Sequence, residues 1–276
     1  MKSTLGRWRG QLRAGDYDHL APRHLARLAR LYALDRKGRR HYRLLTEGEL
    51  LATRTSDTAF VLGSGRSLVE ITESEWVAIA RFNTISLREF PRQHWVRADY
   101  HLTAEVDFMD EYACRLRENP LYARTVFVVA GGFWAEAGNE LVGRRLLPEG
   151  ARIFRFRRAS RSANEAPSRT ARTLVHGYNS IFDATNLAVA LGFRRIVLAG
   201  ADYYNKEYFW LAPGETRDYE KPGITASMRF SGTAQIVSML GDWADVLAPE
   251  GIELSVLNPQ SLLAERLPVF DRTTLS

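Results

Sequence analysis

The stretch FVLGSGRSL, residues 60–68, decides the fold. Its apolar first half predicts a buried strand, which runs directly into a turn built from Gly63, Ser64 and Gly65. Glycines let the backbone approach a ligand closely, and free amides in such a turn can point at phosphate oxygens. A dinucleotide-binding pattern would need a third glycine at Leu68, and a P-loop would need a Gly-Lys-Ser/Thr. The segment therefore predicts a nucleotide-binding turn or, alternatively, a tight strand-to-helix turn with no ligand.

Outward from this turn, short apolar strands alternate with longer helical or loop segments. This alternation predicts an α/β fold, a Rossmann-like parallel sheet with helices on both faces. The expected strands are 59–62, 77–82, 100–103, 125–130, 152–156, 195–199 and 252–257, and the expected helices are 105–117, 180–191 and 233–247. Residues 157–175 are interpreted as an exposed loop, and residues 203–230, rich in aromatic and charged side chains, as a small lid.

Composition excludes several classes of protein. The chain has 276 residues, of which 45% are hydrophobic, so it can bury a substantial core and is neither disordered nor a coiled coil. The single cysteine, Cys114, cannot form an internal disulfide, and the first residues lack the apolar core of a secretory signal. No apolar run approaches the length of about 18 residues that would span a bilayer. The sequence predicts a cytoplasmic protein.

The net charge of +6 is concentrated at the N-terminus. Residues 1–57 hold 13 Lys and Arg against 6 Asp and Glu, whereas residues 58–276 hold 25 against 26. A helix is expected from Pro22 to Gly38, with arginines on one face. We interpret residues 1–57 as a basic helical arm, which is either a solvated cap or a surface for an anionic membrane. Nucleic acid is disfavoured because the basic excess does not extend over the body of the chain.

Two further segments place polar groups after predicted strands. Asn83 follows strand 77–82 and could reach the same ligand as the glycine turn, or could be an asparagine in a turn. Asp202 follows strand 195–199, where a carboxylate can bind a ribose hydroxyl. Tyr204 and Tyr208 offer phenolic donors to a phosphate. The alternative for this last segment is an aromatic surface loop.

Taken in order, four blocks resemble a known family. They are GSGRSL at residues 63–68, RFN at 81–83, the run from Ser180 through AVALGFRRIVLAGADYY at 188–204, and LNPQSLL at 257–263. Together they look like the bacterial sialyltransferases of glycosyltransferase family 42, over about residues 58–263. The resemblance implies a Rossmann-like domain of the GT-A-type variant with a lid. It also implies metal-free transfer of a sugar acid, of the sialic acid or Kdo type, from a CMP-activated donor to an acceptor glycan or glycolipid.

The resemblance also implies roles for individual residues. Ser180 would lie near the nucleotide and Asp202 near the cytidine ribose, while Tyr204 and, more loosely, Tyr208 would donate hydrogen bonds to the departing CMP phosphate. Residues 58–276 contain no Asp-x-Asp metal pair, in agreement with a scheme that needs no metal and no cofactor beyond the donor. The implied donor-binding residues are Gly63, Ser64, Gly65, Ser67, Asn83, Ser180 and Asp202.

The general base is where the sequence departs from the family. The family's base is a lid histidine, expected near residues 230–232, yet no histidine follows His176. The turn also reads Ser-Gly-Arg-Ser at residues 64–67, where the family has Asn-Gly-Pro-Ser. His176, Glu105 and Asp107 are the alternative bases, each of which could instead be structural. A retaining enzyme would use a carboxylate nucleophile, which suits Glu105 and Asp107 better.

The sequence thus predicts two units, residues 1–57 and residues 58–276, and a transferase on the inner face of the cell membrane that builds polysaccharide or lipopolysaccharide. The alternative is a nucleotide-binding protein of the same fold without transferase activity, or a pterin diphosphokinase-like enzyme. The sequence leaves the oligomeric state open, although the resembled family often forms homo-tetramers.

Overall fold

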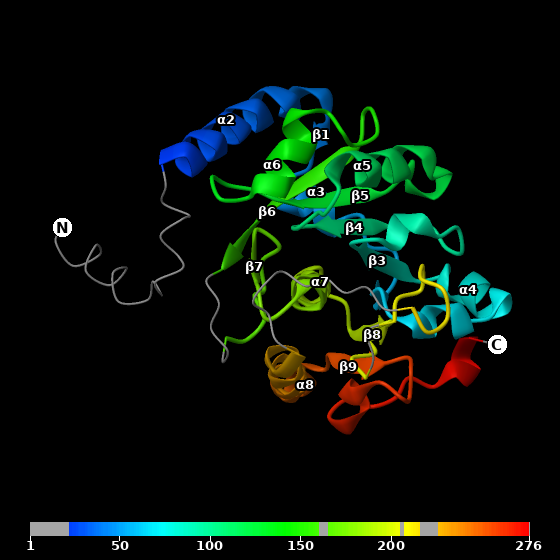
Figure 1. The fold of residues 1–276 in the computed structure, drawn as a ribbon. Coiled ribbons are helices and arrows are strands. Elements are labelled where there is room, and N and C mark those ends of the chain that lie inside the picture. Colours follow the sequence, from blue (N-terminus) through cyan, green and yellow to red (C-terminus); the bar gives the residue numbers. More distant parts are fainter. Residues whose placement is uncertain (1–21, 160–164, 205–206, 216–225, 276) are drawn as a thin grey trace.

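A nine-stranded sheet forms the centre of the molecule in a computed structural model, which describes residues 22–159, 165–204, 207–215 and 226–275, with only the backbone given for residues 226–232 (Figure 1). The strand order is β1-β6-β5-β4-β3-β2-β8-β9, with β7 paired to β6, and every pairing between these strands is parallel. The predicted α/β class with a Rossmann-like parallel sheet is therefore confirmed.

Most of the predicted strands are present within a residue or two of their expected bounds. The strands are β1 (Arg43–Leu44), β2 (Thr58–Leu62), β3 (Asn83–Leu87), β4 (Tyr100–Thr103), β5 (Val126–Ala130), β6 (Arg152–Ala159), β7 (Thr173–Val175), β8 (Arg195–Ala199) and β9 (Glu253–Val256). The helices are α2 (Pro22–Gly38), α3 (Glu47–Leu51), α4 (Glu73–Ile79), α5 (Met109–Glu118), α6 (Glu136–Gly143), α7 (Ser180–Ala190) and α8 (Ala226–Leu247).

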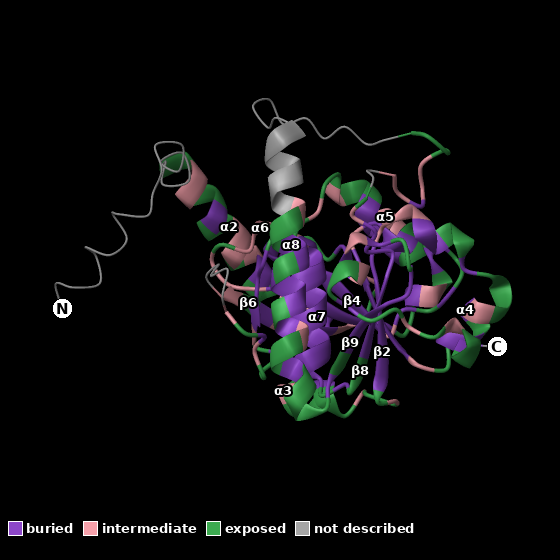
Figure 2. Ribbon diagram, turned by 90° about the horizontal axis from the view of Figure 1, so that it is seen from below, coloured by how far each residue is buried: buried purple, intermediate pink, exposed green. Residues whose placement is uncertain are grey.

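Helices cover both faces of the sheet. Successive residues of a strand point to opposite faces, and both sets are apolar here, so each face must be buried by helices. Ala59 and Val61 of β2 pack in one cluster with α7 and α8, whereas Phe60 and Leu62 pack in another with α4. A third cluster joins α5 and α6 to the second face of β5 and β6. Every residue of α7 is buried, and Figure 2 shows this helix between α8 and the strands. The Phe182 and Trp243 rings meet edge to face at 5.2 Å across the contact of α7 with α8.

The strand predicted at residues 77–82 is wrong. Thr72 and Glu75 form a reciprocal capping box that begins α4, in which each side chain accepts a hydrogen bond from the other residue's backbone amide. Trp76 and Ile79 are buried while Val77 is 58% exposed, which is a helical spacing. The strand follows instead as β3, so Asn83 begins a strand rather than following one.

Residues 22–57 pack against the sheet and its helices. The predicted helix is present as α2, and β1 pairs with β6 in the central sheet, so the expected boundary at residue 58 falls inside the α/β fold. Asp35 of α2 is fully buried and forms ion pairs with Arg39 and, at 3.0 Å, with Arg155 of β6. A Cβ on Gly38 would lie 2.1 Å from a backbone oxygen of α6, which shows how closely α2 and α6 approach.

Three other expectations need correction or fall outside the structure. α5 begins at Met109, four residues after the start predicted at residue 105. The predicted loop 157–175 contains the end of β6 and all of β7, and its residues 160–164 lie outside the described part of the chain. α8 begins at Ala226, so the last part of the predicted lid 203–230 is helical, and residues 216–225 lie outside the described residues. Within the described chain, no helix is long and apolar enough to cross a membrane.

Candidate active site

A cleft of about 310 Å³ opens at the carboxyl edge of the sheet, above the ends of β2 and β8. From β2 the chain runs outward in one direction through β3, β4, β5 and β6, and it then returns to place β8 on the other side of β2. This reversal of strand order creates a crevice between β2 and β8, which is where open parallel sheets bind ligands. Five of the predicted site residues line the cleft: Ser64, Gly65, Ser180, Asp202 and Tyr208.

The glycine turn after β2 is held by the neighbouring strand. The amides of Gly63, Ser64 and Gly65 all donate to backbone oxygens of Ala199 or Gly200, at 2.7 to 3.1 Å. The expectation that these amides are free for phosphate oxygens is therefore wrong. A Cβ on Gly63 would lie 2.4 Å from the Gly200 oxygen, so close packing of the two turns explains this glycine without a ligand.

Ser64 supplies the group in this turn that a ligand could satisfy. Its hydroxyl is buried and has no hydrogen-bond partner among the described residues, although Ser64 lines the cleft. Most buried polar atoms in proteins are hydrogen-bonded, so an orphan hydroxyl beside a cleft is a candidate ligand contact.

Asp202 joins three strand ends into one rigid edge. Its carboxylate accepts hydrogen bonds from the Ser67 amide at 3.0 Å, from the Ser67 hydroxyl, and from the Asn258 side-chain amide at 3.0 Å. A Cβ on Gly65 would lie 2.2 Å from the same carboxylate. Asp202 is only 4% exposed, so its first role in the described structure is to hold the turns after β2, β8 and β9 together.

The two tyrosines predicted to bind phosphate lie in different surroundings. Tyr208 lines the cleft, and its ring stacks on Trp210 with the centroids 4.7 Å apart. Tyr204 is 37% exposed, lies outside the cleft lining, and accepts a hydrogen bond from Asn258 at 3.3 Å. The neighbouring Tyr203, which the sequence did not single out, lines the cleft instead, and its hydroxyl accepts a hydrogen bond from Asn179 at 2.9 Å.

The segment that carries Tyr208 is fastened to the glycine turn. Tyr208 forms an antiparallel bridge with Gly65, and the Phe209 amide donates a hydrogen bond to the backbone carbonyl oxygen of Ser64. Arg66 donates to the Leu211 oxygen at 2.7 Å. These contacts hold one part of the predicted lid, the segment that carries residues 208–211, against the turn after β2.

The amino end of α7 closes another side of the cleft. Asn179 caps the helix by accepting a hydrogen bond from the Ile181 amide, and Asn179, Ser180 and Ile181 all line the cleft. A helix amino terminus carries a partial positive charge, which favours an anionic ligand. The unpartnered Ser64 hydroxyl belongs to the lining of the same cleft.

Arg88 was missed by sequence reasoning. It directly follows β3, lines the cleft and has a left-handed backbone with φ of 51°, a conformation that is uncommon for residues other than glycine. Its guanidinium lies 3.4 Å from the Asp107 carboxylate and 3.9 Å from that of Glu105. The misplaced strand concealed it, because Arg88 follows the true strand where Asn83 was expected.

The three candidate bases belong to one charged network beside the cleft. His176 follows β7, and its Nδ1 lies 3.0 Å from Asp183, which accepts a hydrogen bond from Arg158 at 2.8 Å. Arg158 also donates to Glu105 at 2.8 Å. Loss of some solvent around the Glu105 carboxylate acts to raise its pKa, but the hydrogen bond from Arg158 and the nearby positive charges outweigh it, so the pKa lies below its ordinary value. His176 is buried, whereas Glu105 and Asp107 are exposed carboxylates.

Asn83 lies at the wrong edge of the sheet for a role in the cleft. It begins β3, so its side chain is at the amino edge, where its oxygen accepts hydrogen bonds from the amides of Thr55 and Ser56 at 2.9 and 3.0 Å. Asn83 is 1% exposed and ties the segment before β2 to β3. The prediction that it reaches the same ligand as the glycine turn is therefore wrong.

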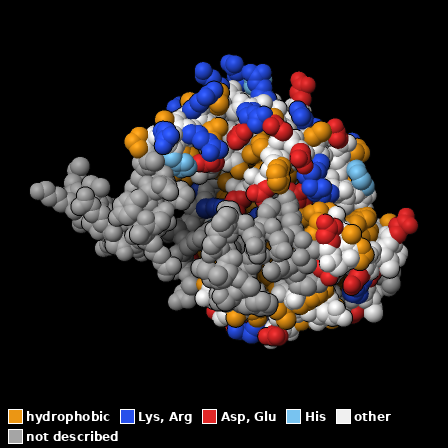
Figure 3. Space-filling model, in the orientation of Figure 1, with side chains coloured by type: hydrophobic (Ala, Val, Ile, Leu, Met, Phe, Trp, Pro, Cys, Tyr) orange, Lys and Arg blue, Asp and Glu red, His pale blue; other side chains and the backbone are white. Residues whose placement is uncertain are grey.

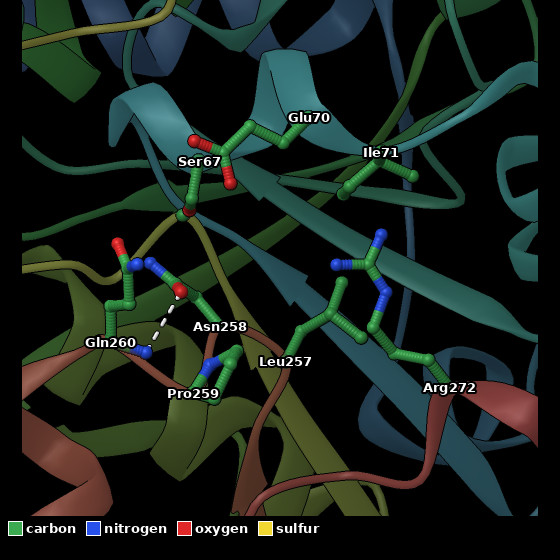
Figure 4. Close-up of a pocket in the computed structure, with 9 residues that line it drawn as sticks. Ser67, Glu70, Ile71, Leu257, Asn258, Pro259, Gln260 and Arg272 are labelled. Atoms are coloured by element: carbon green, nitrogen blue, oxygen red, sulfur yellow. Dashed lines mark hydrogen bonds between the residues drawn. The ribbon is translucent and has the colours of Figure 1, made fainter.

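A smaller cavity, of about 120 Å³, lies between the segment after β2 and the segment after β9 (Figure 4). It is lined by Ser67, Asn258 and Gln260, and by Arg272, whose guanidinium is already paired with Glu75 by two hydrogen bonds of 2.7 Å. Small-molecule sites usually have volumes of about 300 to 1,000 Å³, so this cavity is too small for a nucleotide. In the part of the chain that the structure describes, no cluster of three or more His, Cys, Asp or Glu side chains could hold a metal ion.

The fold and site define an α/β protein with a cleft at the switch point of a parallel sheet. No protein-family model matches the sequence, and no curated protein matches it. Among solved structures, the chain is similar to the sialyltransferase CstII from Campylobacter jejuni in complex with the substrate analogue CMP-3FNeuAc, with 15% identity, a TM-score of 0.39, and 79% of this chain and 87% of that chain covered. CstII in complex with a trisaccharide acceptor and CMP is also similar, with 15% identity, a TM-score of 0.37 and the same coverage of 79% and 87%.

Proposed function

We propose that the protein is a glycosyltransferase that moves a sugar acid, of the sialic acid or Kdo type, from a CMP-activated donor to an acceptor glycan or glycolipid. The observation that carries the proposal is the cleft between β2 and β8. Two of the four sequence blocks that resemble the family 42 sialyltransferases supply residues to this cleft, Ser64 and Gly65 from one and Ser180 and Asp202 from the other. Asn258 of a third block donates a hydrogen bond to the Asp202 carboxylate.

The cleft offers suitable chemistry for a nucleotide phosphate and a leaving group. The amino end of α7 favours the negative charge of the phosphate, and the Ser64 hydroxyl can donate to one of its oxygens. The Tyr208 hydroxyl can stabilise the charge that develops on the departing phosphate without adding a positive charge to the site. Tyr204 would take part only through its contact with Asn258.

The acceptor hydroxyl needs a base beside the cleft, and Glu105 or Asp107 would supply it. Both carboxylates lie next to Arg88, which itself lines the cleft. Glu105 is ionised at neutral pH and can accept a proton, and its lowered pKa makes it a weaker base than a free carboxylate. His176 would act through Asp183 and Arg158, as a residue that positions Glu105.

A second candidate function is nucleotide binding without sugar transfer. It is favoured by one observation, that no histidine follows His176 in the sequence, so that the base used by the resembled family has no counterpart near residue 230. In this alternative the cleft binds CMP, but an added acceptor releases no CMP from the donor.

A thermal-shift screen without divalent metal tests the nucleotide site. CMP at 100 times its dissociation constant should add about 2.7 kcal/mol to the free energy of unfolding, and UMP, GMP and AMP should add less. Ser64→Ala should weaken CMP binding without loss of stability, because the hydroxyl has no partner among the described residues. Ser238→Ala, at an exposed position on α8, is the matched control. Equal stabilisation by all four nucleotides would overturn the assignment.

The proposal includes attachment to the inner face of the cell membrane through α2. α2 itself presents no exposed acid, because its one carboxylate, Asp35, is buried, and among its cations Arg27 pairs with Glu136 of α6. Figure 3 shows Lys and Arg side chains gathered over this part of the molecule. Each cation near an anionic bilayer contributes about 1 kcal/mol at low salt. The charge-reversed variant Arg36→Glu/Lys37→Glu of the full chain should lose sedimentation with phosphatidylserine vesicles, and unchanged sedimentation would contradict the attachment.

A further inference from the structure

A second hollow, of about 870 Å³, lies at the carboxyl ends of β4, β5 and β6, next to α2. We call it the α2 groove. It is separate from the cleft between β2 and β8, and α2 lies in the part of the sequence that does not resemble the sialyltransferases. Its walls include Arg27 and Tyr32 of α2, Phe133 and Trp134 of the loop after β5, and Glu105 and Asp107 after β4.

Three aromatic rings follow one another along the α2 groove. The Tyr32 and Phe133 ring centroids are 6.2 Å apart, and those of Phe133 and Trp134 are 5.2 Å apart with the planes nearly perpendicular. Trp134 is 58% exposed, although tryptophan is highly buried on average. An open row of aromatic faces in a concave surface offers large, rigid contact area to a ligand.

The polar groups of the α2 groove are arranged in neutralising pairs. Arg27 lies 3.2 Å from Glu136 on one side, and Arg158 lies 2.8 Å from Glu105 on the other. The groove therefore carries many hydrogen-bond donors and acceptors with little net charge. An anionic polymer would need a net positive wall, and a partner helix would need a continuous apolar one. Figure 3 shows acidic, basic and hydrophobic side chains intermingled on this face of the molecule.

The backbone of the groove is also open on the side of the aromatic loop. Gly132 has φ of +110°, and a Cβ there would meet nothing within 4 Å. The Gly132 and Trp134 carbonyl oxygens already accept hydrogen bonds within this loop, so the open side offers a ligand room beside the Trp134 ring rather than backbone partners.

We infer that the α2 groove binds a hydroxyl-rich saccharide, with one sugar ring against Trp134 and its hydroxyl groups on the paired charges of Glu105 and Arg158. Identifying this saccharide as the acceptor rests on the proposed transferase function. Arg88 lines the cleft while its partners Glu105 and Asp107 line the groove, so donor and saccharide would meet along one shared wall.

Binding of fluorescently labelled full-length protein to an array of immobilised glycans tests the inference. At least one glycan should be retained, and the affinity for that glycan is then measured in solution by calorimetry. Trp134→Ala should weaken it at least about tenfold, as truncation of a central tryptophan typically does. Trp95→Phe, which alters another exposed tryptophan stacked on Trp76, should leave the affinity within about twofold. An array with no retained glycan, or wild-type affinity in Trp134→Ala, overturns the inference.

Two further measurements distinguish a failure of the saccharide site from a failure of the proposed transferase function. Arg27→Ala removes an exposed group of α2 across the groove and should weaken glycan binding about threefold, which tests the site even if Trp134→Ala proves unstable. The CMP thermal shift should be the same in wild type and Trp134→Ala. Glycan binding without a CMP effect would refute the proposed transferase and keep the saccharide site. A CMP effect without glycan binding would refute the saccharide site alone.

Discussion

The Asp202 carboxylate should be required for folding stability even in the absence of a ligand. It accepts three hydrogen bonds, two from Ser67 and one from Asn258, and it is 4% exposed. In Asp202→Asn, one acceptor oxygen becomes a donor that faces another donor, whichever way the amide is turned. A hydrogen bond to a charged group contributes about 1.5 to 3 kcal/mol, and an unpaired buried donor costs about 1 to 3 kcal/mol.

The expected loss for Asp202→Asn is therefore about 2 to 4 kcal/mol in the free energy of unfolding. For a chain of this size, this corresponds to a fall in Tm of roughly 5 to 15 °C. Urea unfolding of the ligand-free protein measures the loss directly, with an unchanged m value showing that the change lies in stability.

A swap of the two partners provides the control. In Asp202→Asn/Asn258→Asp, the amide at 202 can donate to the carboxylate at 258, so the double variant should recover at least about 1 kcal/mol relative to Asp202→Asn. Wild-type stability in Asp202→Asn together with lost CMP binding would refute the reasoning, because it would make the carboxylate a ligand contact alone.

Three other residues give independent checks. Glu75 has a pKa of about 2, held below its ordinary value of 4.5 mainly by hydrogen bonds from Arg272. Its stabilising effect is therefore present above about pH 4.5 and is lost as the pH falls toward 2. The difference in urea midpoint between wild type and Glu75→Gln should shrink from pH 7 to pH 3. Gly38→Ala should lower the free energy of unfolding by about 1 to 3 kcal/mol, because the added methyl group meets the backbone of α6. Gly48→Ala adds a methyl group with nothing within 4 Å, so thermal melts of the two variants should show it to be neutral or slightly stabilising. Arg158→Gln should raise the pKa of Glu105, as measured by an NMR titration, because the variant removes the hydrogen bond and positive charge that lower it. An unchanged pKa would contradict the proposed contact between Arg158 and Glu105.

The sequence predicted the sheet well because its strands are buried on both faces and read as short apolar runs between turn residues. It failed at residues 77–82, where Val77 and Ile79 are as apolar as the residues of a strand would be. The capping pattern of Thr72 and Glu75 was the signal that identifies a helix there. That single error moved one strand by several residues and replaced Arg88 with Asn83 as the polar group at its end.

The candidate site was predictable in its location but not in its contacts. The reversal of strand order around β2 follows from an α/β pattern, and it brings Ser64, Ser180 and Asp202 to one cleft. The sequence could not show that the amides of the glycine turn are used by β8, because this depends on the register of two strands far apart in the chain. The position of α2 depends on a buried pair, Asp35 with Arg155, which the sequence pattern of a basic arm conceals.

The pairing of β2 with β8 also determines when the cleft can exist during synthesis. Val61 pairs with Leu198, so about half of the chain must be translated after one strand before its neighbour emerges. At about 5 to 20 residues per second, this interval lasts roughly 7 to 30 seconds, during which one edge of β2 has no partner strand. An unpaired apolar edge is prone to wrong association, so a nascent chain paused between β2 and β8 should be the species most dependent on chaperones. The cleft is thus among the last parts of the protein to form on the ribosome.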